Sequence, residues 1–298
     1  MSIANRPSKI TLPTQNKGWD NLLEFVTEQF PLIDKGIWIA RFNAGKIHWL
    51  SGEIVNANSA FVANQTLCYY REVKQEPEIP FEHRILFQNE HILVADKPHY
   101  LPVTPGGQYV NECLLERLRK QTHLKDLVPL HRLDRETAGL VLFSVNKDSR
   151  GTYAQLFAEQ KISKTYQAVA DISQTTLVET NWTVNNRLEK GQPTFIMQQV
   201  DGAPNACSEI RLIDRAGQLG FFELNPLTGK THQLRLHMMD IGYPILNDKF
   251  YPELEPKQPL SFDNPLQLLA KKLSFTDPIS AEPLQFTSEQ DLSTWNLN

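Results

Sequence analysis

This sequence has no long apolar run, few cysteines and no excess of basic residues. A helix that spans a bilayer needs about 20 consecutive apolar residues, and no stretch approaches that length. Residues 1–15 lack the basic, apolar and small-residue pattern of a secretory signal, so we expect a cytoplasmic protein. The three cysteines, Cys68, Cys113 and Cys207, are odd in number and far apart. This spacing argues against a disulfide framework or a zinc cluster.

The charge balance is slightly acidic. The chain carries 30 lysines and arginines against 34 aspartates and glutamates, for a net charge of −4. Nucleic-acid-binding proteins draw much of their affinity from neutralising phosphates. Composition alone therefore argues against RNA as a partner, and any RNA contact has to come from a local basic patch.

Length and patterning indicate a globular protein with two domains. The 298 residues are 41% hydrophobic and 21% charged, which suffices for one large or two modest cores. Helical spacing of apolar residues predicts helices over 19–30 and 33–42, and a hairpin is expected over 47–55 with its turn at Ser51-Gly52. The polar segment 72–80 contains two prolines and is the natural linker. We therefore expect domains at 1–75 and 81–298.

The second domain shows four blocks of interest. A hairpin is expected over 84–95, followed by a proline- and glycine-rich loop and a helix over 111–121. Residues 131–139 read HRLDRETAG and precede the apolar run LVLF, which predicts a charged loop feeding a buried strand. An alternating strand is expected over 164–169, and a helix runs from an N-cap at Thr231 to about Ile241. Asp148 is expected to cap a helix ending near Gln160, and 266–286 forms a hairpin.

Asp134 is the carboxylate that this loop would hold in place. A neighbouring arginine favours the ionised form of a carboxylate. The alternative is a surface loop with local ion pairs, each worth only about 0–1 kcal/mol.

Spacing argues against two other sites, a phosphate-binding loop and a pair of zinc-binding histidines on one helix. The GKT at 229–231 lacks the glycine that a phosphate-binding loop needs at Leu224, and His232 and His237 are five residues apart rather than four.

The four blocks resemble the RluA-type family of RNA pseudouridine synthases, which modify ribosomal and transfer RNA. HRLDRETAG resembles the family signature H-R-L-D-R-[DE]-T-[SA]-G, and KTY at 164–166 and GKTHQLRLH at 229–237 resemble two further motifs. The resemblance covers about residues 81–288. Departures from the pattern occur at Tyr100, Thr104, Asn247 and Leu269, where the family has glycine, histidine, glycine and histidine.

The resemblance implies an α+β fold with a mixed, largely antiparallel, bent central β-sheet flanked by helices and loops. Residues 1–75 resemble the small S4-like α/β module that precedes many of these enzymes. Its usual basic residues are few here, represented by Lys35, Arg41 and Lys46. An accessory domain without RNA contact is the alternative for this module.

The implied reaction converts uridine to pseudouridine, an isomerisation that needs no cofactor. Asp134 is the implied catalytic carboxylate, Arg235 pairs with it, and Tyr166 lies against the target base, where its hydroxyl helps to deprotonate C5. Arg132 fills the stack vacated by the flipped base. Further substrate contacts are expected from His131, Leu133, Lys97, Lys230 and His232, with Arg135 and Lys249 as possible phosphate contacts.

The expected partner is a stem-loop of ribosomal or transfer RNA. We expect neither DNA nor a membrane as a partner, no metal site, and a monomer. Two alternatives belong to other classes of function. One is a non-enzymatic RNA-binding protein that retains the fold, and the other is an acid-dependent hydrolase that pairs Asp134 with a histidine.

Overall fold

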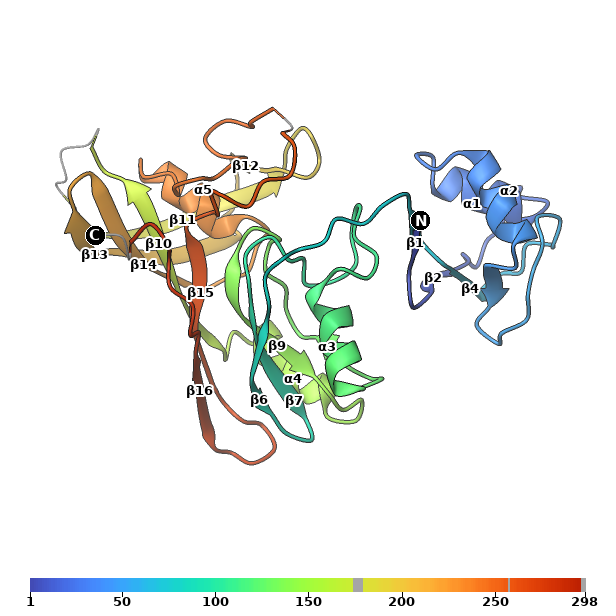
Figure 1. The fold of residues 1–298 in the computed structure, drawn as a ribbon, viewed down its shortest axis with the longest axis horizontal. Helices are drawn as coiled ribbons and strands as arrows, with labels where there is room; N and C mark the ends of the chain where they lie inside the picture. Colours follow the sequence, from blue (N-terminus) through green and yellow to red (C-terminus); the bar gives the residue numbers. More distant parts are fainter. Residues whose placement is uncertain (174–178, 257, 296–298) are drawn as a thin grey trace. The chain divides into compact units, whose positions relative to one another are not determined.

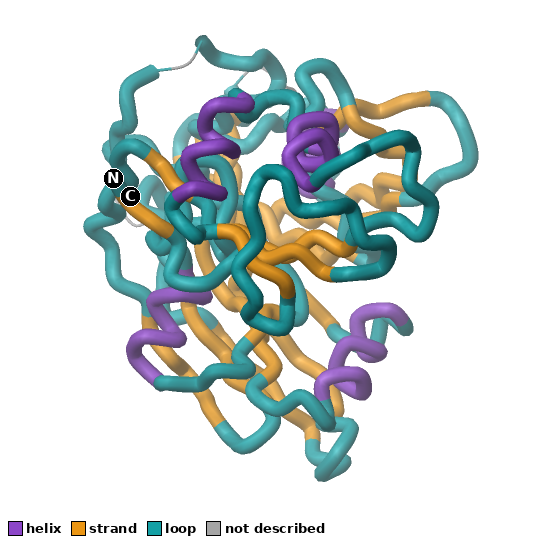
Figure 2. Tube along the Cα trace, turned by 90° about the vertical axis from the view of Figure 1, so that its right-hand side faces the viewer, coloured by secondary structure: helices purple, strands orange, loops and turns teal. Residues whose placement is uncertain are grey.

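The computed structural model describes residues 1–173, 179–256 and 258–295. The chain forms two compact units (Figure 1). The first comprises Met1–Pro77 with Gly106–Asn111, and the second comprises Glu78–Pro105 with Glu112–Asn298. Strands and loops make up most of the trace and the helices are short (Figure 2). No helix in the described part of the chain is long and apolar enough to cross a membrane.

The first unit contains two helices and two small sheets. Helix α1 spans Leu22–Gln29 and α2 spans Lys35–Asn43. Each begins at a side-chain cap, because the Asn21 carboxamide accepts from the backbone N–H of Glu24 and the Asp34 carboxylate accepts from that of Gly36. The sheets are β2-β4-β3 and β1-β5, with bounds β1 Ser2–Ile3, β2 Ser8–Thr11, β3 Ile47–Trp49, β4 Thr66–Tyr69 and β5 Glu72–Val73.

The structure confirms one sequence-based expectation for this unit and corrects another. The hairpin over 47–55 is present, because the backbone N–H of Trp49 donates to the carbonyl of Glu53 at 2.8 Å and that of Val55 to the carbonyl of Ile47 at 3.2 Å. The other edge of β3 pairs with β4. The linker begins later than expected, since Glu72 lies in β5 and forms ion pairs with Arg41 and Lys46.

The second unit is built on one eleven-stranded sheet with the order β12-β11-β13-β14-β10-β15-β9-β7-β6, with β16 beside β15 and β8 beside β9. Every described pair in this sheet is antiparallel except β15 with β9. The expected mixed, largely antiparallel sheet is therefore confirmed. The strands are β6 Arg84–Gln88, β7 Ile92–Lys97, β8 Val128–Pro129, β9 Ala138–Ser144, β10 Ser163–Asp171, β11 Asn181–Lys190, β12 Met197–Val200, β13 Ala206–Ala216, β14 Leu219–Pro226, β15 Leu268–Thr276 and β16 Pro283–Thr287.

Three helices belong to this unit: α3 (Leu114–Thr122), α4 (Arg150–Ala158) and α5 (Gln233–Asp240). Leu234 and Met238 of α5 enter a core cluster with Phe222 and Leu224 of β14, and Ile241 packs against it. Leu234, Met238 and Ile241 thus form one apolar stripe on α5. Because that stripe packs against the sheet, α5 cannot rotate about its axis. The direction in which Arg235 leaves the helix is therefore fixed.

The two predicted helix caps in this unit are wrong. Helix α4 has Ser149 rather than Asp148 at its N-cap, and α5 has His232 rather than Thr231, neither with a side-chain cap bond. The side chain of Gln233 ties the start of α5 to the preceding turn and to β13. Its Oε1 accepts from the backbone N–H of Lys230 at 3.0 Å, and its Nε2 donates to the carbonyl of Cys207 in β13 at 2.9 Å.

Candidate active site

Asp134 lies in a turn that directly precedes the buried strand β9, as the sequence predicted. The turn closes where the backbone N–H of Thr137 donates to the carbonyl of Asp134 at 3.1 Å. At the start of β9, Gly139 has φ +109° and pairs with Ala270 of β15. A Cβ at this glycine would lie 2.3 Å from the Ala270 carbonyl oxygen. Close approach of two backbones therefore fixes the base of the Asp134 turn.

Lys97 fastens the turn from the other side and does not contact solvent. Its buried ammonium donates to the carbonyls of Pro98, Leu101 and Arg135 at 3.0, 2.8 and 3.1 Å. Burial lowers the pKa of Lys97 to about 7, although the charges of Glu136 and Asp134 oppose this. An ammonium enclosed by three carbonyls cannot reach a phosphate, so we withdraw the expected substrate contact of Lys97.

His131 is also a structural residue rather than a substrate contact. Its Nε2 accepts from the backbone N–H of Leu142 in β9 at 3.0 Å, and its ring lies 5.0 Å from that of Phe157. Burial lowers the pKa of His131 to about 3, so the ring is neutral and its acceptor nitrogen is occupied. Leu133 is buried as well.

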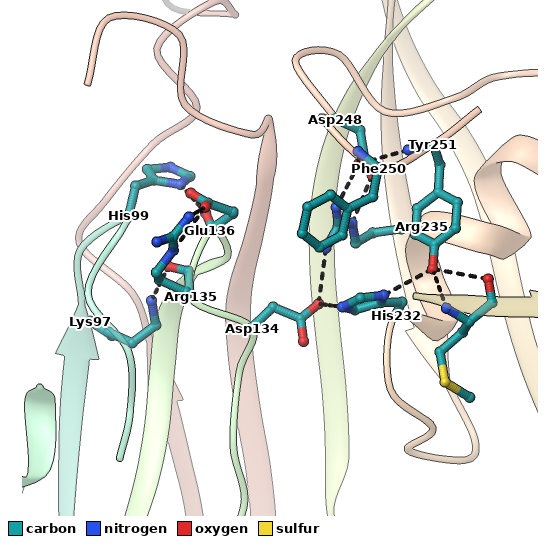
Figure 3. A network of polar contacts seen from close by, with 11 residues as sticks. Lys97, His99, Asp134, Arg135, Glu136, His232, Arg235, Asp248, Phe250 and Tyr251 are labelled. Atoms are coloured by element: carbon teal, nitrogen blue, oxygen red, sulfur yellow. Dashed lines mark hydrogen bonds and ion pairs between the residues drawn. The ribbon is translucent and has the colours of Figure 1, made fainter. Parts of the chain in front are cut away.

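Helix α5 brings Arg235 to the turn (Figure 3). The Arg235 Nη1 lies 3.5 Å from the Asp134 Oδ2, and the same guanidinium binds Asp248 with two hydrogen bonds, Nε to Oδ2 at 2.7 Å and Nη2 to Oδ1 at 2.5 Å. Arg235 and Asp248 have side-chain exposures of 2% and 1%, whereas Asp134 is 28% exposed. Burial would lower the pKa of Arg235, but the two carboxylates raise it. The buried Arg235 guanidinium thus pairs with the buried carboxylate of Asp248 and with the accessible carboxylate of Asp134.

An aromatic shell surrounds this guanidinium. It lies 4.7 Å from the ring centre of Phe250 and 5.3 Å from that of Tyr251. Asp248 organises this shell, because its Oδ1 also accepts from the backbone N–H groups of Phe250 and Tyr251. The Tyr251 hydroxyl contacts the Nδ1 of His232 at 2.9 Å.

His232 is the second neighbour of Asp134, with its Nε2 3.9 Å from Oδ2. Burial lowers the pKa of His232, although the charge of Asp134 opposes this. The imidazole is therefore neutral at pH 7, and the cation that faces Asp134 is Arg235. His237, the other histidine of the motif, does not belong to this group. Its Nε2 lies 3.0 Å from the Oδ1 of Asn186, with which it forms a hydrogen bond. Among the described residues, no group of three or more His, Cys, Asp or Glu side chains is arranged to hold a metal ion.

Tyr166 reaches the same region from β10. It pairs across the sheet with Ala270, which in turn pairs with Gly139, so Tyr166 and the Asp134 turn are linked through β15. Burial and the charge of Asp134 both raise the pKa of Tyr166. Arg132 and Lys230 are exposed, and neither side chain forms a hydrogen bond or ion pair with the part of the chain that the structure describes.

Asp248, Phe250 and Tyr251 were missed by the sequence analysis. Asp248 closes the segment YPILND, and nothing local indicated a role for it. A lone aspartate after an apolar segment is far more often exposed than buried. Its function becomes visible only when α5 places a buried arginine beside it.

Comparisons with known proteins agree with this geometry. The family model described as RNA pseudouridylate synthase matches residues 91–240, which include the Asp134 turn, Tyr166 and Arg235. An uncharacterised RNA pseudouridine synthase of Synechocystis is 30% identical over 233 residues, covering 77% of this chain and 79% of its own. The dual-specificity RNA pseudouridine synthase RluA of Pasteurella multocida is 31% identical over 217 residues, covering 68% of this chain and 91% of its own.

A solved structure shares the fold. Human RNA Pseudouridylate Synthase Domain Containing 4 has a TM-score of 0.55 and 26% identity, and the match covers 72% of this chain and 90% of that one. Fold, family model and sequence relatives thus point the same way. The chain belongs to the RNA pseudouridylate synthase family, RluA type, and is an RNA-modifying isomerase.

Proposed function

We propose that this protein isomerises specific uridines in stem-loops of ribosomal or transfer RNA, with Asp134 as the catalytic carboxylate. The observation that carries this assignment is the shared guanidinium. Arg235 is buried and held by Asp248, and its free Nη1 faces Asp134, which is the accessible member of the pair. A carboxylate that is oriented by a fixed cation and open to solvent is positioned for attack or proton abstraction.

The reaction breaks the N1–C1′ bond, turns the base and joins C5 to C1′, and the proton on C5 is finally lost to solvent as N1 gains one. Product and substrate have the same atoms, so no oxidant or reductant is required. Asp134 either attacks C1′ or takes the 2′ proton, and both roles need the ionised carboxylate. Arg235 orients this group without being consumed.

Tyr166 supports the extruded uracil by stacking. A raised pKa keeps its hydroxyl protonated at neutral pH, which favours a role as a hydrogen-bond donor over a role as a phenolate base at C5. Arg132 is exposed and without a partner in the described part of the chain, which fits a side chain that enters the vacated base stack. Lys230 is also exposed, which fits a lysine that contacts a phosphate of the RNA. His232 lies beside Asp134 and contacts the substrate there.

We also propose that residues 1–75 form an S4-like module ahead of a catalytic domain at 81–298, in a monomeric cytoplasmic protein. Two helices followed by short strands support the S4 likeness. Arg41 and Lys46 are paired with Glu72, so Lys35 is the remaining expected RNA contact. Lys35→Glu in the full chain should weaken RNA binding with unchanged turnover at saturating RNA. Unchanged affinity would favour an accessory module without RNA contact.

The target is identified by mapping pseudouridine in total RNA. RNA from cells lacking the protein is compared with wild-type RNA by the chemical adduct of pseudouridine and primer stops. We expect at least one site to vanish on deletion and to return when the purified chain is added. If no site changes, the chain acts as a non-enzymatic RNA-binding protein instead.

A further inference from the structure

A large aromatic side chain stands at the tip of the β11–β12 hairpin. Residues 191–196 connect the two strands, and the backbone N–H of Gly191 donates to the carbonyl of Ile196 at 3.0 Å. Within this turn Phe195 is 55% exposed. A single exposed apolar residue is common on protein surfaces, so its exposure alone indicates nothing.

The neighbours of Phe195 distinguish it from other exposed apolar residues. Its ring centre lies 5.6 Å from that of Phe250, at an interplanar angle of 54°. Phe250 itself lies over the guanidinium of Arg235 at 4.7 Å and beside the ring of His232 at 5.5 Å (Figure 3). Arg235, which pairs with Asp134, thus contacts the ring of Phe250, and Phe250 contacts the exposed ring of Phe195.

The hairpin is anchored at this point. The backbone of Met197, two residues after Phe195, bonds to the Tyr251 hydroxyl in both directions, with N–H to Oη at 2.8 Å and Oη to the carbonyl at 3.1 Å. Tyr251 in turn contacts His232. The turn that carries Phe195 is therefore tied to the same side chains that surround Asp134, and the position of its ring is set relative to the site.

We propose that Phe195 is an RNA-binding residue that stacks on a nucleobase of the substrate strand next to the uridine that is modified, with Phe250 supporting it from behind. This inference rests on the proposed function. Every nucleobase has a π face, so an aromatic side chain binds RNA without requiring a particular base. Stacking also supplies affinity that does not depend on charge, which suits a chain with a net charge of −4.

The test uses the full chain and total RNA from cells lacking the protein, labelled with tritium at C5 of uridine. Isomerisation replaces the C5–H bond and releases tritium to water. We expect Phe195→Ala to raise the apparent KM about tenfold with little change in kcat. Its effect should persist at every salt concentration, because no phosphate contact is lost.

Replacements separate stacking from simple packing. Phe195→Trp should restore the wild-type KM and Phe195→Leu should not, since leucine has no π face. Ile279→Ala is the matched control, because Ile279 is 51% exposed at the turn between β15 and β16, and it should leave the KM unchanged.

An unchanged KM for Phe195→Ala overturns the proposal, as does a wild-type KM for Phe195→Leu, which would assign the side chain to packing against Phe250. These outcomes are distinct from failure of the proposed function. If the wild-type chain releases no tritium, the function itself is wrong. If it releases tritium and Phe195→Ala behaves identically, only the stacking role is lost.

Discussion

At the scale of single residues, the site depends on one guanidinium shared by two carboxylates. Asp248 is fully enclosed and binds Arg235 with two hydrogen bonds, so it cannot react. Asp134 is partly open and faces the remaining nitrogen of the same group at 3.5 Å. The burial of each carboxylate agrees with the proposed roles, Asp248 as a positioning residue and Asp134 as the group that meets substrate.

Asp248→Asn removes the charge that compensates a buried arginine. Loss of one partner of a buried ion pair costs about 3–5 kcal/mol of folding free energy. We expect a lower free energy of unfolding in denaturant titrations. We also expect a kcat reduced about a hundredfold, because small displacements of a positioned group have effects of that size, while the KM for RNA changes little.

Asp240→Asn is the control for this variant. Asp240 is exposed at the last residue of α5, and surface substitutions usually change stability by less than about 0.5 kcal/mol. Wild-type stability and turnover in Asp248→Asn would show that Arg235 is held by other contacts and would contradict the positioning role.

Two departures from the family motifs lie where the backbone is left-handed. Tyr100 and Asn247 replace glycines of the pattern, and both have left-handed backbones, with φ 66° and 63°. Asparagine tolerates this conformation and the Asn247 side chain donates to the Pro265 carbonyl at 3.0 Å.

The predicted substrate contact of Lys97 is wrong, because its sequence neighbours gave no indication that three carbonyls from two loops would enclose its ammonium group.

At the scale of elements, the parallel pair β9–β15 supports the Asp134 turn. Gly139→Ala would place a methyl group 2.3 Å from the Ala270 carbonyl oxygen at φ +109°. Both the clash and the backbone strain have to be relieved by moving β9. We expect the free energy of unfolding to fall by at least about 3 kcal/mol, with loss of activity, as measured by denaturant titration and tritium release.

Gly151→Ala in α4 is the matched control. Apart from its chain neighbours and the backbone of α4 itself, nothing lies within 4 Å of the added Cβ, and alanine stabilises a helix relative to glycine by up to about 1 kcal/mol. Equal behaviour of the two variants would mean that β9 and β15 can separate at no cost and that the close approach does not fix the turn.

Most elements followed from local pattern, whereas some of their ends did not. The hairpins β6–β7 and β15–β16 and the strand β10 matched alternation and turn residues, because those features are local. The start of the linker and the start of α5 did not match. Each depends on a distant residue, since Glu72 pairs with β1 and with Arg41, and Gln233 reaches back to β13.

At the scale of the whole molecule, three blocks far apart in the sequence converge on one site. Asp134, Tyr166 and Arg235 come from a turn, a central strand and a helix, and the sheet order β10-β15-β9 makes the first two neighbours. Motif resemblance anticipated this convergence. The net charge of −4 did not, because a charge total does not show where single basic residues such as Arg132 and Lys230 are exposed.

Asp134→Asn removes the carboxylate to which we assign the chemistry. The measurement is tritium release from C5-labelled total RNA of cells lacking the protein, alongside RNA binding and the melting temperature. Asn keeps the size of the side chain but has no carboxylate to attack C1′ or to take a proton. We predict no detectable release, with RNA binding and melting temperature retained, and wild-type release in the exposed-site control Asp201→Asn. Release by Asp134→Asn at the wild-type rate would show that Asp134 is not the catalytic carboxylate.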